Sequence, residues 1–168
     1  MEAIYRRRSI RKYTKEPVSE EALREFIRAG MAAPSAGNQQ PWHFIIIDMR
    51  DLLDAIADIH PYAQMLRQAH AAILVCGDLD LEQHEGFWVQ DCSAATENIL
   101  LEIADRGFGG VWLGVYPRND RVQGIRKLLE IPERVVPFSL IAVGHPAEQK
   151  EPKREFLEER LRRNRWND

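Results

Sequence analysis

Apolar residues recur at helical spacing in several stretches of the chain. In residues 20–31, one face is predicted to be buried, and Ser19 stands where an N-cap would begin the helix. The apolar residues of that face are Leu23, Phe26, Ile27 and Met31. A buried stripe of this period is typical of an amphipathic helix, and a serine at its start satisfies free backbone N–H groups. Further helices are predicted at residues 2–8, 50–59, 86–106 and 119–130.

Short, continuous runs of apolar and β-branched residues separate these helices. Such runs are typical of strands with little exposed face. They predict four strands, at residues 43–47, 71–77, 110–115 and 138–143. Because strands and helices follow one another along the chain, a layered α/β or α+β domain is expected.

The predicted helix at residues 86–106 is apolar over more than one face, so it is expected to be buried on several sides. Gly107 follows it as a left-handed cap, because glycine accepts a positive φ without steric strain. A single small subunit could hardly cover all the apolar positions of such a helix. It is therefore the best candidate for the core of a dimer.

The tail of about residues 145–168 is highly charged and has no clear apolar stripe. Glu158 with Arg162, and Glu159 with Arg163, have the i,i+4 spacing of ion pairs on an exposed helix. A tail of this kind is expected to pack on something else, such as a second subunit, although a solvated surface explains the same charges.

Composition narrows the function classes. At 168 residues, without an internal repeat or a linker, the chain is expected to form one domain over residues 1–168. The net charge of −3 argues against nucleic-acid binding, and no apolar run reaches the roughly 18 residues of a membrane span. Without a signal-peptide core, and with Cys76 and Cys92 expected as buried thiols, a cytoplasmic protein is predicted. The histidines lack zinc-ligand spacing, so no metal is expected.

Three guanidinium groups and a hydroxyl stand within the five residues Arg7-Arg8-Ser9-Ile10-Arg11. Such a cluster can bind a phosphate through charge-assisted hydrogen bonds, although alone it also fits a solvated basic turn. In extended chain, Arg7, Ser9 and Arg11 would project to one side, while Arg8 and Ile10 face the other.

Two later segments add more specific features. The segment Pro34-Ser35-Ala36-Gly37-Asn38-Gln39-Gln40-Pro41-Trp42 offers small residues that let backbone approach a planar ligand, and an Asn38 amide that donates and accepts hydrogen bonds. The segment Gly110-Val111-Trp112-Leu113-Gly114-Val115-Tyr116-Pro117 ends a predicted strand. Trp112 there also has an ordinary explanation as a core aromatic.

In this order the three segments resemble the FMN-dependent nitroreductase family. The resemblance covers nearly the whole chain and implies an α+β fold with a central, mostly antiparallel sheet flanked by helices. It also implies a homodimer with exchanged terminal arms, in which two FMN molecules lie at the subunit interface. The FMN-binding set that it implies is Arg7, Arg8, Ser9, Arg11, Pro34, Ser35, Ala36, Asn38, Trp112, Leu113, Gly114, Lys153 and Arg154.

The resemblance also assigns roles within this set. Arg7 and Ser9 would hold the phosphate, with Lys153 and Arg154 of the tail closing over it. Arg11 would reach the pyrimidine edge and stabilise the reduced flavin at N1 and O2.

The backbone N–H of Gly114 would lie near the hydride-accepting atom N5. The segment from Pro34 to Asn38 would meet the FMN bound mainly by the other subunit, with Ala36 standing where many members have serine.

The implied function is an oxidoreductase that passes hydride from NADH or NADPH through FMN to a nitroaromatic, quinone or similar small acceptor by a ping-pong cycle. No catalytic side chain beyond the flavin is implied. One alternative within the enzymes is reductive dehalogenation or flavin breakdown, which the short segment between residues 76 and 88 disfavours. The others are an FMN-binding storage or sensing protein and an FMN-free interaction protein. Residues 59–67 or 78–86 are the candidate substrate-facing loops.

Overall fold

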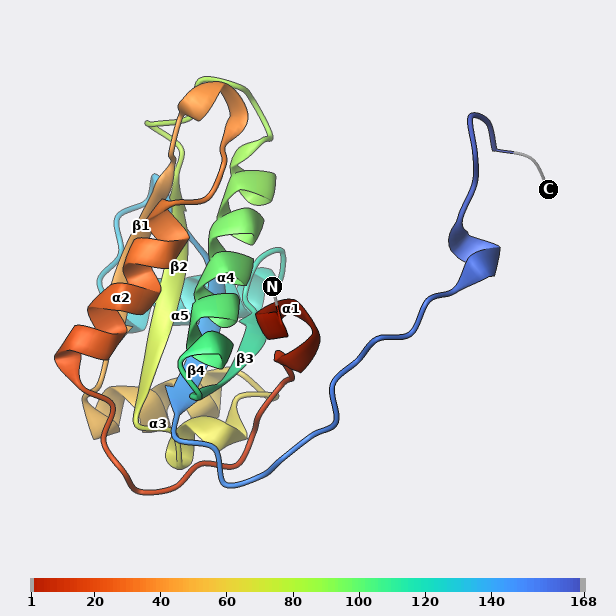
Figure 1. The fold of residues 1–168 in the computed structure, drawn as a ribbon. Helices are drawn as coiled ribbons and strands as arrows, with labels where there is room; N and C mark the ends of the chain where they lie inside the picture. The colour runs from red at the N-terminus through yellow and green to blue at the C-terminus, as the bar shows by residue number, and fades with distance from the viewer. Residues whose placement is uncertain (1, 167–168) are drawn as a thin grey trace.

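The computed structural model describes residues 2–166. A four-stranded sheet forms the centre of the protein, with strand order β1-β2-β4-β3 and every neighbouring pair antiparallel (Figure 1). This confirms the predicted α+β class and the antiparallel sheet. The strands are β1 (Trp42–Ile47), β2 (Ala71–Asp78), β3 (Gly109–Gly114) and β4 (Val135–Gly144).

Helices cover both faces of the sheet (Figure 1). The pair α2 and α4 packs on one face, and α3, α5 and the short turn η2 pack on the other. A short helix, α1, lies against α4. The bounds are α1 (Glu2–Arg6), α2 (Glu20–Met31), α3 (Arg50–Ile59), α4 (Trp88–Asp105) and α5 (Asn119–Leu128), with 3-10 turns η1 (Ala36–Asn38), η2 (Gln64–Arg67) and η3 (Glu158–Arg160).

Strand β2 is buried along nearly its whole length because both its faces meet a core. Ile73 belongs to the core under α2 and α4, whereas Leu74 belongs to the core under α3 and α5. The two thiols are buried, as predicted, and burial raises the pKa of Cys76 to about 12. Successive side chains of β2 therefore pack into two separate cores, one on each face of the sheet.

Local signals set the ends of the helices. Ser19 caps α2, its Oγ accepting a hydrogen bond of 3.2 Å from the N–H of Ala22. Met31 is exposed and not part of the buried face as predicted, because it is the last residue of α2 and the apolar face packs on the core before it. Helix α4 begins two residues later than predicted, because Gly86 has a φ of +81° that no helix continues. Gly107, with a φ of +80°, follows the end of α4 as the predicted left-handed cap.

The tail departs from the prediction of an exposed helix. After β4 the chain first runs beside the N-terminal segment and then leaves the body of the protein (Figure 1). It forms only the short turn η3, and Arg162 donates to the carbonyls of Glu159 and Leu161 instead of pairing along a helix. A short charged segment without an apolar face gains too little from packing to stay helical. Residues 167–168 of the predicted tail lie outside the described residues.

Three large apolar side chains of this tail are exposed, namely Phe156, Leu161 and Trp166. Within residues 2–166, no helix combines the length and the apolar character that crossing a membrane requires.

Candidate functional site

The arginine motif lies against the edge strand β3. Ser9 bridges to Gly110, and the N–H of Ile10 donates a hydrogen bond of 3.0 Å to the Gly110 carbonyl. The hydroxyl of Tyr13 donates to the Ile10 carbonyl over 2.6 Å, and both of these side chains are buried. The fold thus joins the first and third sequence motifs side by side.

The chain that follows β4 holds the arginine motif from the other side. The N–H of Arg11 donates to the carboxylate of Glu148 over 2.6 Å, and the ammonium of Lys150 donates to the Ser9 carbonyl over 2.6 Å. The hydrogen bond from Arg11 lowers the pKa of Glu148. The motif is therefore fixed by backbone contacts that leave the Arg11 side chain free for another partner.

Arg7 departs from the predicted alternation with Arg8. Both line one cleft of about 310 Å³ between α1, α4 and the chain after β4. The N–H of Arg7 still bonds to the Ala3 carbonyl, so the chain is not yet extended there. The Arg7 Nε lies 3.3 Å from a carboxylate oxygen of Glu97, and Arg8 donates to the Glu151 carbonyl. From Arg8 onward the lining follows the predicted alternation, because Ile10 also lines this cleft whereas Ser9 and Arg11 do not.

Lys153 and Arg154 lie against α1, beside the same cleft. The N–H of Lys153 donates to the Tyr5 carbonyl over 3.0 Å. The guanidinium of Arg154 pairs with Glu2 at 2.6 Å and sits over the Tyr5 ring, 4.5 Å from its centroid. Basic groups from both ends of the chain therefore gather along α1.

A second pocket, of about 460 Å³, opens beside the C-terminal half of β3. It contains the side chain of Arg11 together with three sequence-predicted residues of β3. Its lining is Arg11, His60, Pro61, Tyr62, Gln64, Met65, Trp112, Leu113, Gly114 and Arg121. The charged side chains in this lining are the two arginines, so the pocket favours an anionic or electron-rich ligand edge.

The backbone of Gly114 points into this pocket. Residues along an antiparallel strand alternate in the edge to which both their N–H and C=O point. Gly110 turns its carbonyl outward to Ile10, so Gly114, four residues on, also faces outward. Its N–H therefore points away from β4, and no atom comes within 4 Å of a Cβ built on this glycine. The pocket thus contains an open backbone donor.

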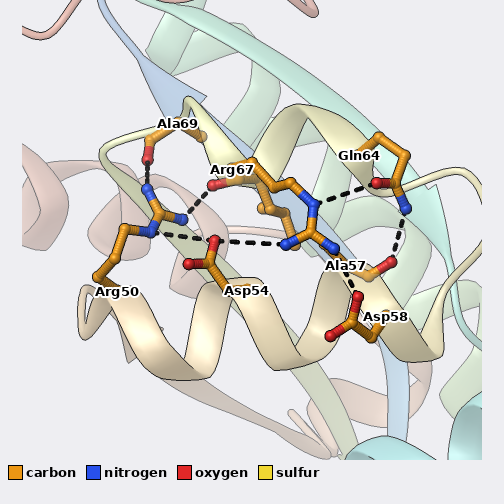
Figure 2. Close-up of polar contacts among 8 residues, drawn as sticks. Arg50, Asp54, Ala57, Asp58, Gln64, Arg67 and Ala69 are labelled. Atoms are coloured by element: carbon orange, nitrogen blue, oxygen red, sulfur yellow. Dashed lines mark hydrogen bonds and ion pairs between the residues drawn. The ribbon is translucent and has the colours of Figure 1, made fainter.

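The wall that η2 contributes is braced on α3 (Figure 2). The amide of Gln64 donates to the Ala57 carbonyl over 2.7 Å and accepts from Arg67 over 3.2 Å. Asp54 lies 3.3 Å from the Nε of Arg50 and 4.0 Å from Arg67. Gln64 is thereby used to fix the wall, and Met65 beside it is held against the pocket.

The loop from Pro34 to Asn38 lies elsewhere. It sits at the N-terminal end of α4, whereas Arg7 pairs toward the C-terminal half of that helix. None of its residues lines either pocket described above. Gly37 and Asn38 both have positive φ, near +54° and +57°, which gives the loop its tight turn. Within one chain, the structure does not bring this predicted part of the site to the arginine motif.

Sequence reasoning missed the polar group that holds this loop. Asp91 is buried in α4 and accepts from the Ala36 N–H over 2.9 Å and from the Gln39 amide over 2.6 Å. The Gln39 oxygen in turn accepts from the N–H groups of Gln83 and His84. A signal was present, because an aspartate one residue before Cys92 falls at the edge of the apolar stripe of the predicted helix.

The fold and the pockets define an α+β protein with an exposed strand edge and basic side chains beside it. A family model described as the nitroreductase family matches residues 4–61 and 58–145. The chain belongs to this family. In the described residues, no three His, Cys, Asp or Glu side chains group as metal ligands.

Known proteins similar to this chain agree with that membership. A Methanothermobacter thermautotrophicus protein named as an NADH dehydrogenase/NAD(P)H nitroreductase is 49% identical over 166 residues, which cover 99% of this chain and 87% of that protein. A crystal structure of a protein with the same name from Parabacteroides distasonis has a TM-score of 0.94 at 42% identity, covering 98% and 97% of the two chains.

A nitroreductase from Desulfovibrio desulfuricans, solved in complex with FMN, has a TM-score of 0.84 at 35% identity and covers 99% of this chain and 96% of that one.

Proposed function

We propose that this protein is an FMN-dependent oxidoreductase that takes hydride from NADH or NADPH and passes it to a nitroaromatic, quinone or similar small acceptor. The observation that carries the proposal is the meeting of Arg11 and the outward Gly114 N–H in one pocket on the strand edge. The solved FMN complex of a 35% identical relative supports the same cofactor.

The residues present fit FMN. A flat ring needs an unobstructed surface, and a Cβ at Gly114 would meet no neighbour within 4 Å. A phosphate needs cations, and Arg7, Arg8 and Lys150 line the adjacent cleft. We expect Arg7 to exchange its contact with Glu97, which is partly exposed, for the phosphate. When bound, FMN would supply the hydride chemistry.

Arg11 would stabilise negative charge at the pyrimidine edge. Its backbone is held by Glu148, and within residues 2–166 no carboxylate lies within ion-pair distance of its guanidinium. A cation that has no partner in the protein is available to stabilise an anionic ligand edge. Trp112 and Leu113 would complete the wall beside it.

We propose a homodimer in which the loop from Pro34 to Asn38 completes the partner's FMN site. This loop is formed and braced within its own chain but lies away from that chain's own Arg7 and Arg11 pockets. The exposed apolar side chains of the tail after Arg154 would be buried on the partner. The 168 residues would form one domain with that exchanged arm.

A ping-pong cycle follows if both reactants use the same face of the flavin in turn. We favour residues 59–67 as the substrate-facing loop, because His60, Tyr62 and Met65 line the pocket. The N–H groups of residues 83 and 84 instead donate to Gln39.

With buried, unpaired thiols, a cytoplasmic location remains our expectation.

The visible spectrum of the purified protein tests the proposal, recorded before and after anaerobic addition of NADH or NADPH. Flavin bands that bleach rapidly and return with a nitroaromatic or quinone support the reductase. Bands that bleach slowly and without saturation favour the storage or sensing alternative. A colourless protein that FMN cannot reconstitute contradicts the proposal.

A further inference from the structure

Two side chains that this function does not yet use meet at the carbonyl of Gly114. Arg121 Nη1 donates to that oxygen over 2.7 Å, and His60 Nε2 lies 2.9 Å from it. They come from different elements, His60 from the end of α3 and Arg121 from the first turn of α5. Two donors therefore converge on one acceptor at the end of an edge strand.

The tautomer of His60 follows from its other contact. The N–H of Tyr62 donates to His60 Nδ1 over 3.2 Å, so Nδ1 is the unprotonated nitrogen. The proton of the neutral ring then sits on Nε2 and is donated to Gly114. The His60 side chain is buried, 1% exposed, so its orientation is fixed by packing as well as by these bonds.

Folding stability does not explain the place of Arg121. A cation in the first turn of a helix meets the positive end of the helix dipole, which is unfavourable. The Nε of Arg121 is also buried without a hydrogen-bond partner in the described chain. Departures of this kind concentrate at functional sites. The Arg121 guanidinium contacts the Gly114 carbonyl, His60 Nε2 at 3.4 Å from Nη1, and the Tyr62 ring, whose centroid lies 5.4 Å from the guanidinium carbon.

The strand ladder restrains Gly114 on one side only. It ends β3, its pairing with Ser139 is the last of the ladder, and its backbone is exposed. Glycine also has the widest conformational freedom of any residue. In a strand, the N–H and C=O of one residue point to the same edge, so fixing the carbonyl also fixes the direction of the N–H.

We propose that His60 and Arg121 are positioning residues for the flavin: by holding the Gly114 carbonyl, they aim the Gly114 N–H at N5. This inference rests on the proposed function. The direction of the N–H that would face N5 then depends on two side chains from other elements and not on the strand alone.

The test compares His60→Leu with His60→Gln, whose amide nitrogen reaches the place of the imidazole Nε2. Cys92→Ala, a buried change in the α4 core, controls for general destabilisation. The two readouts are the dissociation constant of FMN by fluorescence titration and the ¹⁵N chemical shift of N5 in protein loaded with labelled FMN.

His60→Leu is expected to weaken FMN binding about tenfold, as the loss of one well-placed hydrogen bond does, and to shift the N5 resonance. His60→Gln should restore both readouts. If His60→Leu does not fold, Arg121→Gln against Arg121→Lys tests the same carbonyl, with Lys expected to keep part of the effect.

An N5 resonance that is the same in His60→Leu and wild type overturns the inference while leaving the flavoprotein intact. The same holds if Cys92→Ala shifts the resonance equally. Wild-type protein that never binds FMN contradicts the proposed function itself, and the inference with it.

Discussion

Gln39 and Asp91 share a hydrogen bond of 2.6 Å in the interior of the protein, between the segment that follows η1 and the first turn of α4. Both side chains are buried, and within residues 2–166 no arginine, lysine or histidine pairs with the carboxylate. The bond joins two loops, because Asp91 also holds Ala36 and Gln39 also holds residues 83 and 84.

Asp91→Asn should destabilise the fold by about 1–3 kcal/mol, because the new amide would place its NH₂ against the NH₂ of Gln39. Gln39→Glu should be worse, since it places two carboxylates face to face. In the double variant every donor of this network again faces an acceptor, so most of the lost stability should be recovered. Urea unfolding of all four proteins measures this coupling.

The same four proteins report on FMN binding. If the loop from Pro34 to Asn38 completes the partner's site, FMN affinity should fall in each single variant and recover in the double. Strictly additive effects on stability would contradict the hydrogen-bond arrangement described here.

Replacing Arg11 by alanine should lower the reduction potential of bound FMN. Removing one cation from the pyrimidine edge weakens the negatively charged reduced form, by about 30–60 mV for a two-electron couple. Redox titration of FMN-loaded protein measures the shift. Arg24→Ala on the exposed face of α2 is the matched control. An unchanged potential in Arg11→Ala would remove Arg11 from this role.

Two glycines should respond to alanine in opposite ways. At Gly114 the new methyl meets no atom within 4 Å, so the free energy of unfolding should stay the same or rise by about 0.4–1 kcal/mol. FMN binding should nevertheless weaken, since Gly114 lines the pocket and a methyl group there would take up space beside its N–H. At Gly77 a Cβ would lie 2.3 Å from the Trp88 ring, so the fold itself should suffer. Thermal melts and FMN titrations separate the two effects, and FMN affinity preserved in Gly114→Ala would contradict the assigned pocket.

His60 should make stability depend on pH. Burial lowers the pKa of His60, with Arg121 adding to the effect, while the Gly114 carbonyl opposes it. The unfolded histidine, with a pKa of about 6.5, therefore takes up a proton at a higher pH than the native one. Stability is fully present above about pH 6.5 and falls as the pH drops toward the lower native pKa.

His60→Gln has no group that titrates in this range. The difference in unfolding free energy between wild type and His60→Gln should consequently shrink as the pH falls below about 6.5. A difference that stays constant down to about pH 4.5 would show that His60 binds its proton equally well in both states.

Replacing Phe156, Leu161 and Trp166 of the tail by serine should leave the subunit folded, because all three are exposed within one chain. If they pack on a partner, dimer dissociation should become at least about a hundredfold easier. Sedimentation equilibrium measures the change, with Leu81→Ser as an exposed control on the body. A triple variant as dimeric as wild type would contradict the exchanged arm.

The layered fold could be predicted from the sequence because its signals are local. The continuous apolar run of β2 becomes a strand buried on both faces, and the Ser19 cap forms as the pattern indicates. The tail was misjudged because i,i+4 charge pairs alone do not stabilise a helix that has nothing to pack against.

The sequence did not predict those residues of the site whose contacts are with other protein groups. His60 and Arg121 meet at one acceptor, the Gly114 carbonyl, and their separation of 61 positions hides that relation in the sequence. The brace of Gln64 on α3 is equally invisible, because the amide could have served the ligand as well as the wall. Such roles are set by tertiary contacts and not by residue type.

The outward alternation along β3 also bears on self-association. An edge strand with free N–H and C=O groups is a template for strand addition by another copy of the chain. Here the N-terminal segment occupies the edge at Gly110, and two side chains occupy the carbonyl at Gly114. The uncovered stretch of β3 between them is too short to seat several consecutive strand pairs, so this edge of the sheet is protected from strand addition by the chain itself, with no ligand needed to cover it.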